Sequence, residues 1–146
     1  MPDVERTALV LHSAPQMYAL VNDVARYPEF LPGCVATDVQ EESETHMLAK
    51  MTLRKGPVAQ KFSTSNTLVP DESIQMQLNN GPFEYLEGGW TFTPLSDEAC
   101  KIAFRLNFKF SNRLVGAAFS SYFSELTLTM VDAFTKRAKQ IYGEQA

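Results

Sequence analysis

The sequence predicts an α+β fold in which a curved antiparallel sheet wraps around one long C-terminal helix. Between residues 34 and 110, short segments of alternating apolar and polar side chains are separated by turns rich in Gly, Pro, Asn and Asp. Residues 112–142 then carry apolar side chains at helical spacing. A sheet built from successive hairpins twists and curls as it grows, and one apolar helix face can fill the curl.

Length and composition indicate a single domain over residues 1–146, with a core large enough to need no disulfide or metal. The net charge of -4 disfavours a protein that wraps a nucleic acid broadly, so no DNA partner is expected. Cys34 and Cys100 lack metal-site spacing, and we predict buried free thiols. The N-terminus does not resemble a signal peptide and no window approaches a membrane span, which predicts a cytoplasmic protein.

The first two elements are predicted to be a strand and a short amphipathic helix. Residues 3–12 are β-branched and aliphatic, as in a strand. Ser13 and Gln16 form a capping box that starts the helix, and Pro28 is expected to end it. Its apolar face is predicted to hold Met17, Leu20, Val21 and Val24.

The segment RYPEFLPGC, residues 26–34, is predicted to be an apolar loop because it holds two prolines and one glycine. Exposed loops are usually polar, so an apolar loop has to cover something. This one precedes the sheet, where the curl is expected to open. Phe30, Leu31 and Pro32 are therefore predicted to plug or gate the entrance of a cavity.

Six antiparallel strands are predicted after this loop, at residues 34–41, 46–55, 58–69, 73–79, 84–93 and 100–110. Pro94 to Glu98 is expected to form the last turn. The long helix is predicted from Asn112 to Tyr142, with Ser111 or Asn112 as its cap. No charge falls between Arg113 and Glu125, so this half of the helix is expected to face apolar material on more than one side.

A curved sheet and a straight helix do not fit flush, so side chains or a ligand must fill the space between them. A plain aromatic core explains any single aromatic residue there, and a ligand cavity is the alternative. The predicted cavity wall consists of Phe62, Phe83, Trp90, Phe92, Phe104, Phe108, Phe119, Phe123 and Met130.

Four motifs in the chain resemble one known group of proteins. They are YPxFLPxC from Tyr27 to Cys34, GPF at residues 81–83, LxGxWxF at residues 86–92, and MxxAFxxRAxxxYG at residues 130–143. In this order they are similar to the coenzyme Q-binding branch of the START-like (helix-grip) superfamily. That branch includes the ribosome association toxin RatA and mitochondrial coenzyme Q-binding proteins, with the older name oligoketide cyclase. Gly33 departs from the pattern, because the family usually has Trp at this position.

The resemblance implies a helix-grip (START/Bet v 1-like) fold with a hydrophobic tunnel between sheet and helix. The implied ligand is a ubiquinone or another isoprenoid lipid, with no resident cofactor or metal, and transient contact with a membrane surface would suit it. A polar head group needs one or two hydrogen-bond partners, and Tyr85, Asn66 and Arg105 are candidates.

The sequence leaves three functions open. The first is non-catalytic binding of a hydrophobic ligand that supports respiratory quinone function. The second, implied by the resemblance, is binding to the ribosomal large subunit that blocks 70S association, with RNA contacts through the cations Lys50, Arg54, Lys55 and Lys61.

The third function is that of a polyketide cyclase-like enzyme, which we rank last. Ring closure needs a placed acid or base. His12 and His46 are the two histidines, and both are expected to be solvated. Neither a catalytic triad nor paired-carboxylate spacing is visible, so we predict that the protein is not an enzyme.

Overall fold

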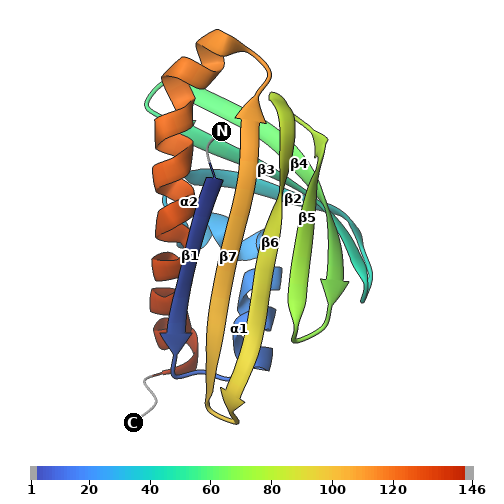
Figure 1. The fold of residues 1–146 in the computed structure, drawn as a ribbon, viewed down its shortest axis with the longest axis vertical. Helices are drawn as coiled ribbons and strands as arrows, with labels where there is room; N and C mark the ends of the chain where they lie inside the picture. Colours follow the sequence, from blue (N-terminus) through green and yellow to red (C-terminus); the bar gives the residue numbers. More distant parts are fainter. Residues whose placement is uncertain (1–2, 144–146) are drawn as a thin grey trace.

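The computed structural model describes residues 3–143, apart from the side chains of Asp3 and Val115, and shows a seven-stranded antiparallel sheet curled around a long helix (Figure 1). The predicted α+β fold is confirmed. The strands are β1 (Asp3–Val10), β2 (Cys34–Glu42), β3 (His46–Lys55), β4 (Val58–Val69), β5 (Ser73–Asn80), β6 (Phe83–Ser96) and β7 (Ala99–Phe110). The helices are α1 (Ala14–Asn22), the short 3₁₀-helix η1 (Val24–Glu29) and α2 (Arg113–Tyr142).

The strand order in the sheet is β1-β7-β6-β5-β4-β3-β2, so hairpins connect all neighbours except the first pair. β1 lies beside β7, and α2 packs along these two strands and against α1 (Figure 1). η1 packs against β2 at the other edge of the sheet. The helices therefore close the concave side of the sheet.

Both helix starts follow from local hydrogen bonds that the sequence predicts. The Ser13 hydroxyl accepts from the backbone N–H of Gln16, and the Gln16 side chain accepts from the backbone N–H of Ser13, which confirms the capping box. At the start of α2, the side-chain oxygen of Asn112 accepts from the N–H of Leu114 at 2.8 Å.

Three predicted boundaries are wrong. The first strand ends at Val10 rather than at residue 12. The first helix ends at Asn22, because Asp23 leaves the helical conformation with φ -85° and ψ 66°, and η1 then includes Pro28. The predicted loop therefore begins with a helical turn.

The third boundary concerns β6, which continues through Pro94 to Ser96, where a turn was predicted. A proline lacks the N–H that an interior strand position needs. β5 pairs with β6 only as far as Thr91, so at Pro94 β6 has a ladder partner on the β7 side alone. The missing N–H consequently breaks no sheet hydrogen bond on the open side.

The backbones of β6 and β7 approach each other closely at Gly88 in the middle of β6. A Cβ atom at this position would lie 2.0 Å from the carbonyl oxygen of Arg105 on β7. Only glycine permits such a close approach of two backbones.

The core between sheet and helix is largely aromatic. The ring of Phe123 on α2 lies 4.7 Å from that of Phe108, 5.4 Å from that of Phe83 and 6.0 Å from that of Phe62. The opposite face of this half of α2 is open, with Leu114 81% exposed and Ala117 and Ala118 also exposed. The expectation that this half meets apolar material on several sides is therefore wrong.

The two cysteines are free and buried, as predicted. Burial raises the pKa of Cys34 and of Cys100 to about 11 in each case. The thiolate is the reactive form of cysteine, so both side chains serve packing in the folded protein.

Candidate ligand pocket

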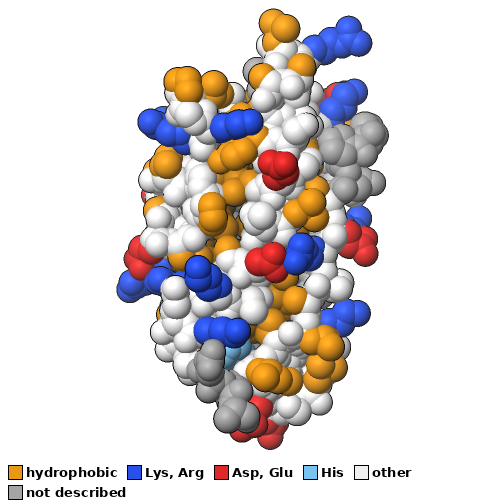
Figure 2. Space-filling model, turned by 90° about the vertical axis from the view of Figure 1, so that its left-hand side faces the viewer, with side chains coloured by type: hydrophobic (Ala, Val, Ile, Leu, Met, Phe, Trp, Pro, Cys, Tyr) orange, Lys and Arg blue, Asp and Glu red, His pale blue; other side chains and the backbone are white. Residues whose placement is uncertain are grey.

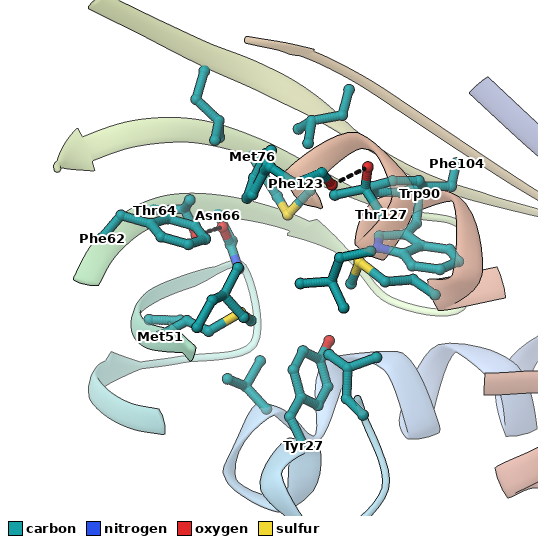
Figure 3. Close-up of a pocket in the computed structure, with 18 residues that line it drawn as sticks. Tyr27, Met51, Phe62, Thr64, Asn66, Met76, Trp90, Phe104, Phe123 and Thr127 are labelled. Atoms are coloured by element: carbon teal, nitrogen blue, oxygen red, sulfur yellow. Dashed lines mark hydrogen bonds between the residues drawn. The ribbon is translucent and has the colours of Figure 1, made fainter. Parts of the chain in front are cut away.

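An apolar pocket lies between the concave face of the sheet and α2, and η1 borders one end of it (Figure 3). Its volume is about 70 Å³. The lining side chains come from β3 to β7, from α2 and from the segment that contains Tyr27 and Leu31. In Figure 3, Tyr27 faces the strand residues across the pocket.

Five of the nine predicted wall residues line this pocket, namely Phe62, Trp90, Phe104, Phe123 and Met130. The other four pack in the surrounding core: Phe83, Phe92, Phe108 and Phe119. The ring of Phe83 stacks on Phe110 at 4.5 Å.

The three predicted entrance residues lie in different surroundings. Leu31 is buried and lines the pocket, whereas Pro32 is exposed. Phe30 packs edge-on against Phe134 at 5.2 Å, and the Arg137 guanidinium lies 4.9 Å from the centre of its ring.

Sequence reasoning predicted Met130 in the wall but missed the apolar residues that β3 and β5 contribute. Met51 and Met76 line the pocket beside Ala49 and Leu53. All four stand at inward positions of alternating strands, so alternation could have identified their face. Methionine has an unbranched, flexible side chain. Met51 on β3, Met76 on β5 and Met130 on α2 therefore make the wall adaptable.

The polar groups of the pocket are few and neutral. The Thr64 hydroxyl donates to the side-chain oxygen of Asn66 at 2.8 Å. The Thr127 hydroxyl donates to the carbonyl oxygen of Phe123 at 3.0 Å, and the Tyr27 hydroxyl donates to that of Val21. Burial raises the pKa of Tyr27 above its ordinary value, with smaller contributions from Cys34 and Asp23. This phenol therefore stays protonated at physiological pH.

Of the three predicted head-group partners, Asn66 lines the pocket. Arg105 is exposed on the outer face of β7. Tyr85 alternates with Leu86 and shares the outer face with Glu87. The structure thus places one of the three candidates at the pocket.

The seam between β3 and α2 is held by Gly33, Arg54 and Tyr122. The Tyr122 hydroxyl donates to the carbonyl oxygen of Arg54 at 2.8 Å, and the Arg54 N–H donates to that of Gly33 at 2.8 Å. Gly33 has φ +81°, and a Cβ there would lie 2.3 Å from the Tyr122 hydroxyl oxygen. The neighbouring Leu53 and Leu126 line the pocket.

Comparison with known proteins identifies the group to which this architecture corresponds. Residues 10–135 match the family described as polyketide cyclase/dehydrase and lipid transport. The chain belongs to this START-like family. Ribosome association toxin RatA from Vibrio cholerae serotype O1 is 56% identical over 144 residues, which cover 99% of this chain and 100% of that relative. RatA from Escherichia coli K12 is 51% identical over 143 residues, which cover 98% of this chain and 90% of that relative.

A more distant member is coenzyme Q-binding protein COQ10 homolog B, mitochondrial, from Xenopus laevis. It is 31% identical over 91% of this chain and 56% of its own length. The predicted resemblance to the RatA and coenzyme Q-binding group is therefore confirmed.

Solved structures show the same START-like fold. Zhui aromatase/cyclase from Streptomyces sp. R1128 superposes with a TM-score of 0.82 at 15% identity, covering 95% of this chain and 94% of that one. A START superfamily protein from Mycobacterium smegmatis superposes with a TM-score of 0.79 at 17% identity, covering 95% of this chain and 98% of that one. These identities are low, so the two structures support the fold alone.

The pocket of this family member offers little for acid–base chemistry. Among the described lining residues there is no Asp, Glu, His, Lys, Arg or Cys. In the described part of the chain, no cluster of three or more His, Cys, Asp or Glu side chains could hold a metal ion. Within residues 3–143, none of the helices is long and apolar enough to span a membrane.

The two histidines lie outside the pocket. His46 is exposed, as expected. His12 is only 3% exposed, so the prediction that it is solvated is wrong. Its ring lies 6.0 Å from that of Tyr142, and its Nδ1 atom has no hydrogen-bond partner within the described residues.

We expect the protein to lose stability as the pH falls below 6.5. Burial, and then the nearby Lys139 ammonium, lower the pKa of His12 from its ordinary value of 6.5. The unfolded chain therefore takes up this proton at a higher pH than the folded protein does, and stability present above pH 6.5 is lost below it. Urea midpoints at about pH 7.5 and about pH 5.5 should differ less for His12→Gln than for the wild type. An equal difference would contradict the prediction.

The predicted basic residues divide between two faces of the sheet. Lys50 and Arg54 alternate on the outer face of β3, and Lys61 shares that face because it pairs opposite Thr52. The Lys55 ammonium instead lies 5.3 Å from the ring centre of Tyr122. Figure 2 shows basic side chains beside exposed hydrophobic ones at the upper end of the molecule.

Proposed function

We propose that the protein binds a hydrophobic ligand in this pocket without transforming it, and that the ligand is an isoprenoid quinone of the ubiquinone type. The observation that carries the proposal is an apolar cavity whose described lining lacks any group ionised at neutral pH. Such a lining suits a neutral lipid and offers no general base. The name of the Xenopus relative, a coenzyme Q-binding protein, supports the choice of a quinone.

An isoprenoid quinone needs more room than the closed pocket provides. The cavity measures about 70 Å³, whereas ligand sites usually measure roughly 300–1,000 Å³. Met51, Met76 and Met130 can change rotamer at little cost, which enlarges the cavity. Release of Tyr122 from Arg54 would open the seam towards solvent and give the isoprenoid tail a path out. The proposal therefore includes an adjustment of side chains when the ligand binds.

Trp90 offers a direct test. It is the only tryptophan of the chain, is 1% exposed and lines the pocket. Decylubiquinone in the pocket should quench its fluorescence in a saturable manner, with one quinone bound per chain. Native mass spectrometry of protein purified from a quinone-producing host should show the same stoichiometry. A flat titration together with a ligand-free mass would overturn the proposal.

Association with the ribosomal large subunit is the second candidate function. Two observations favour it: the RatA relatives match essentially the whole chain, and Lys50, Arg54 and Lys61 share one exposed face. Residues 45–70 contain no acidic residue, although Asp38 pairs opposite Lys50. Phosphate binding requires such local cations even in an acidic protein. This function would place the protein in the cytoplasm.

The ribosome candidate predicts a loss of 70S particles in sucrose gradients when purified protein is added to 30S and 50S subunits. Lys50→Glu/Lys61→Glu should restore the 70S peak, because it reverses two charges on the proposed face. The matched control Lys101→Glu/Lys136→Glu reverses two exposed lysines outside this cluster and should remain active. Unchanged 70S levels with the wild-type protein would exclude the candidate, whatever the result with quinone.

A further inference from the structure

Asn66 is a buried amide on the apolar concave face of the sheet. It lies on β4, directly opposite Met47 on β3 and Met76 on β5. Its side chain is part of the pocket lining, and the residue is 4% exposed. Its nearest cross-strand neighbours are thus methionines, which give a carboxamide no strong hydrogen bond.

The side-chain oxygen of Asn66 has a hydrogen-bond partner, whereas its NH₂ group has none among the described residues. The Thr64 hydroxyl donates to Oδ1 of Asn66 at 2.8 Å and so orients the group. Nδ2 makes no hydrogen bond to the described residues. It is also not fully enclosed by protein atoms. Figure 3 shows this nitrogen directed away from Thr64, among the lining side chains. The NH₂ group is therefore a donor that faces the cavity.

Trp90 presents a second donor of the same kind. Its indole N–H also has no described hydrogen-bond partner, and Figure 3 shows the nitrogen on the edge of the ring that faces the other lining residues. The hydroxyl hydrogens of Thr127 and Tyr27, in contrast, are already donated to backbone carbonyl oxygens. The unused polar groups of the described lining include two donors and no cation.

We propose that Asn66 recognises the ligand by donating to an acceptor oxygen of its head group, with the Trp90 indole as the second donor. This inference rests on the proposed function of the pocket and narrows the ligand class. The head group is neutral and carries carbonyl or ether oxygens. A fatty acid or phosphate head group is disfavoured, because its charge would be buried without a cation among the described lining residues.

A purely structural role for Asn66 makes a different prediction. An amide with an unmade hydrogen bond in apolar surroundings lowers stability, and replacing it with an apolar side chain of similar size relieves this. Thr64→Val/Asn66→Leu, which removes both partners of the hydrogen bond, should therefore leave the urea midpoint of the ligand-free protein unchanged or raised. If Asn66 mainly supported the fold through Thr64, the same double substitution would lower the midpoint.

The experiment uses two probes that share a ten-carbon tail, decylubiquinone and decylbenzene. Binding is followed by the rise in melting temperature for both and by Trp90 quenching for the quinone. In Asn66→Leu, we expect decylubiquinone affinity to fall by about tenfold, as for the loss of one hydrogen bond, while decylbenzene affinity stays constant or increases. Leu68→Met, an apolar exchange on the same strand and face as Asn66 but outside the pocket lining, should change both affinities by less than about threefold.

Two outcomes would overturn the inference while the proposed function stands. One is an equal loss of both probes in Asn66→Leu, which would indicate an effect of shape. The other is unchanged decylubiquinone binding, which would show that the amide makes no contact with the head group. If the wild-type protein binds neither probe, the proposed function itself fails, and the inference fails with it.

Discussion

Replacing Phe123 with Ala is expected to lower the free energy of unfolding by about 3–5 kcal/mol. The Phe123 side chain is 2% exposed, and its ring meets four aromatic rings from three strands, namely those of Phe62, Phe83, Phe108 and Phe110. Removing it leaves a void that these strand residues cannot fill without moving the backbone. Urea unfolding followed by circular dichroism measures the loss.

The matched control is Leu114→Ala on the same helix. Leu114 is 81% exposed, so its truncation should change stability by no more than about 0.5 kcal/mol. Because Phe123 also lines the pocket, the new void joins the existing cavity. Decylubiquinone should therefore raise the melting temperature of Phe123→Ala more than that of the wild type. A Phe123→Ala variant as stable as the control would contradict this description of the core.

Gly33→Ala is expected to have the second large effect. The left-handed conformation at φ +81° alone costs a residue with a Cβ about 1–2 kcal/mol. The new methyl group would also stand 2.3 Å from the Tyr122 hydroxyl oxygen, which forces Tyr122 away from Arg54. We therefore expect lower stability together with an open seam, measured as faster quenching of Trp90 by decylubiquinone.

A double-mutant cycle separates these two contributions. Tyr122→Phe removes the hydroxyl that the methyl group meets, so Gly33→Ala/Tyr122→Phe should be more stable than the sum of the two single changes predicts. Backbone strain remains in both Gly33 variants and does not contribute to the coupling. Strictly additive effects would show that the hydroxyl of Tyr122 does not restrict this position.

The sequence predicts this fold well where periodicity and turn residues agree. β3 and β4 begin and end at the predicted residues, because Gly56 and Pro57 mark their turn and alternation marks their faces. Periodicity fails where one apolar face continues through a break. Val24 extends the face of α1, although Asp23 ends that helix, so the sequence shows no sign of η1.

The site was only partly predictable. A side chain that packs in the core and one that lines a cavity follow the same alternating pattern in the sequence. Phe104 and Phe108 both point inward from β7, yet only Phe104 reaches the pocket. Which of them does so depends on the position of α2 along the strand, which no local pattern encodes. The same applies to Asn66. The sequence indicates Asn66, Tyr85 and Arg105 equally as head-group partners, and only the strand register places Asn66 on the pocket face and the other two on the outer face.

The pairing of β1 with β7 has a consequence for how the chain acquires its fold during synthesis. Asp3 pairs with Asn107 and Val10 with Cys100, so β1 is synthesised well before the strand with which it pairs. Until then, β1 offers an unpaired edge to other chains, and contacts this distant in sequence form slowly. We therefore expect nascent chains that stop before residue 100 to depend on chaperones, and the sheet to close in a late step of translation.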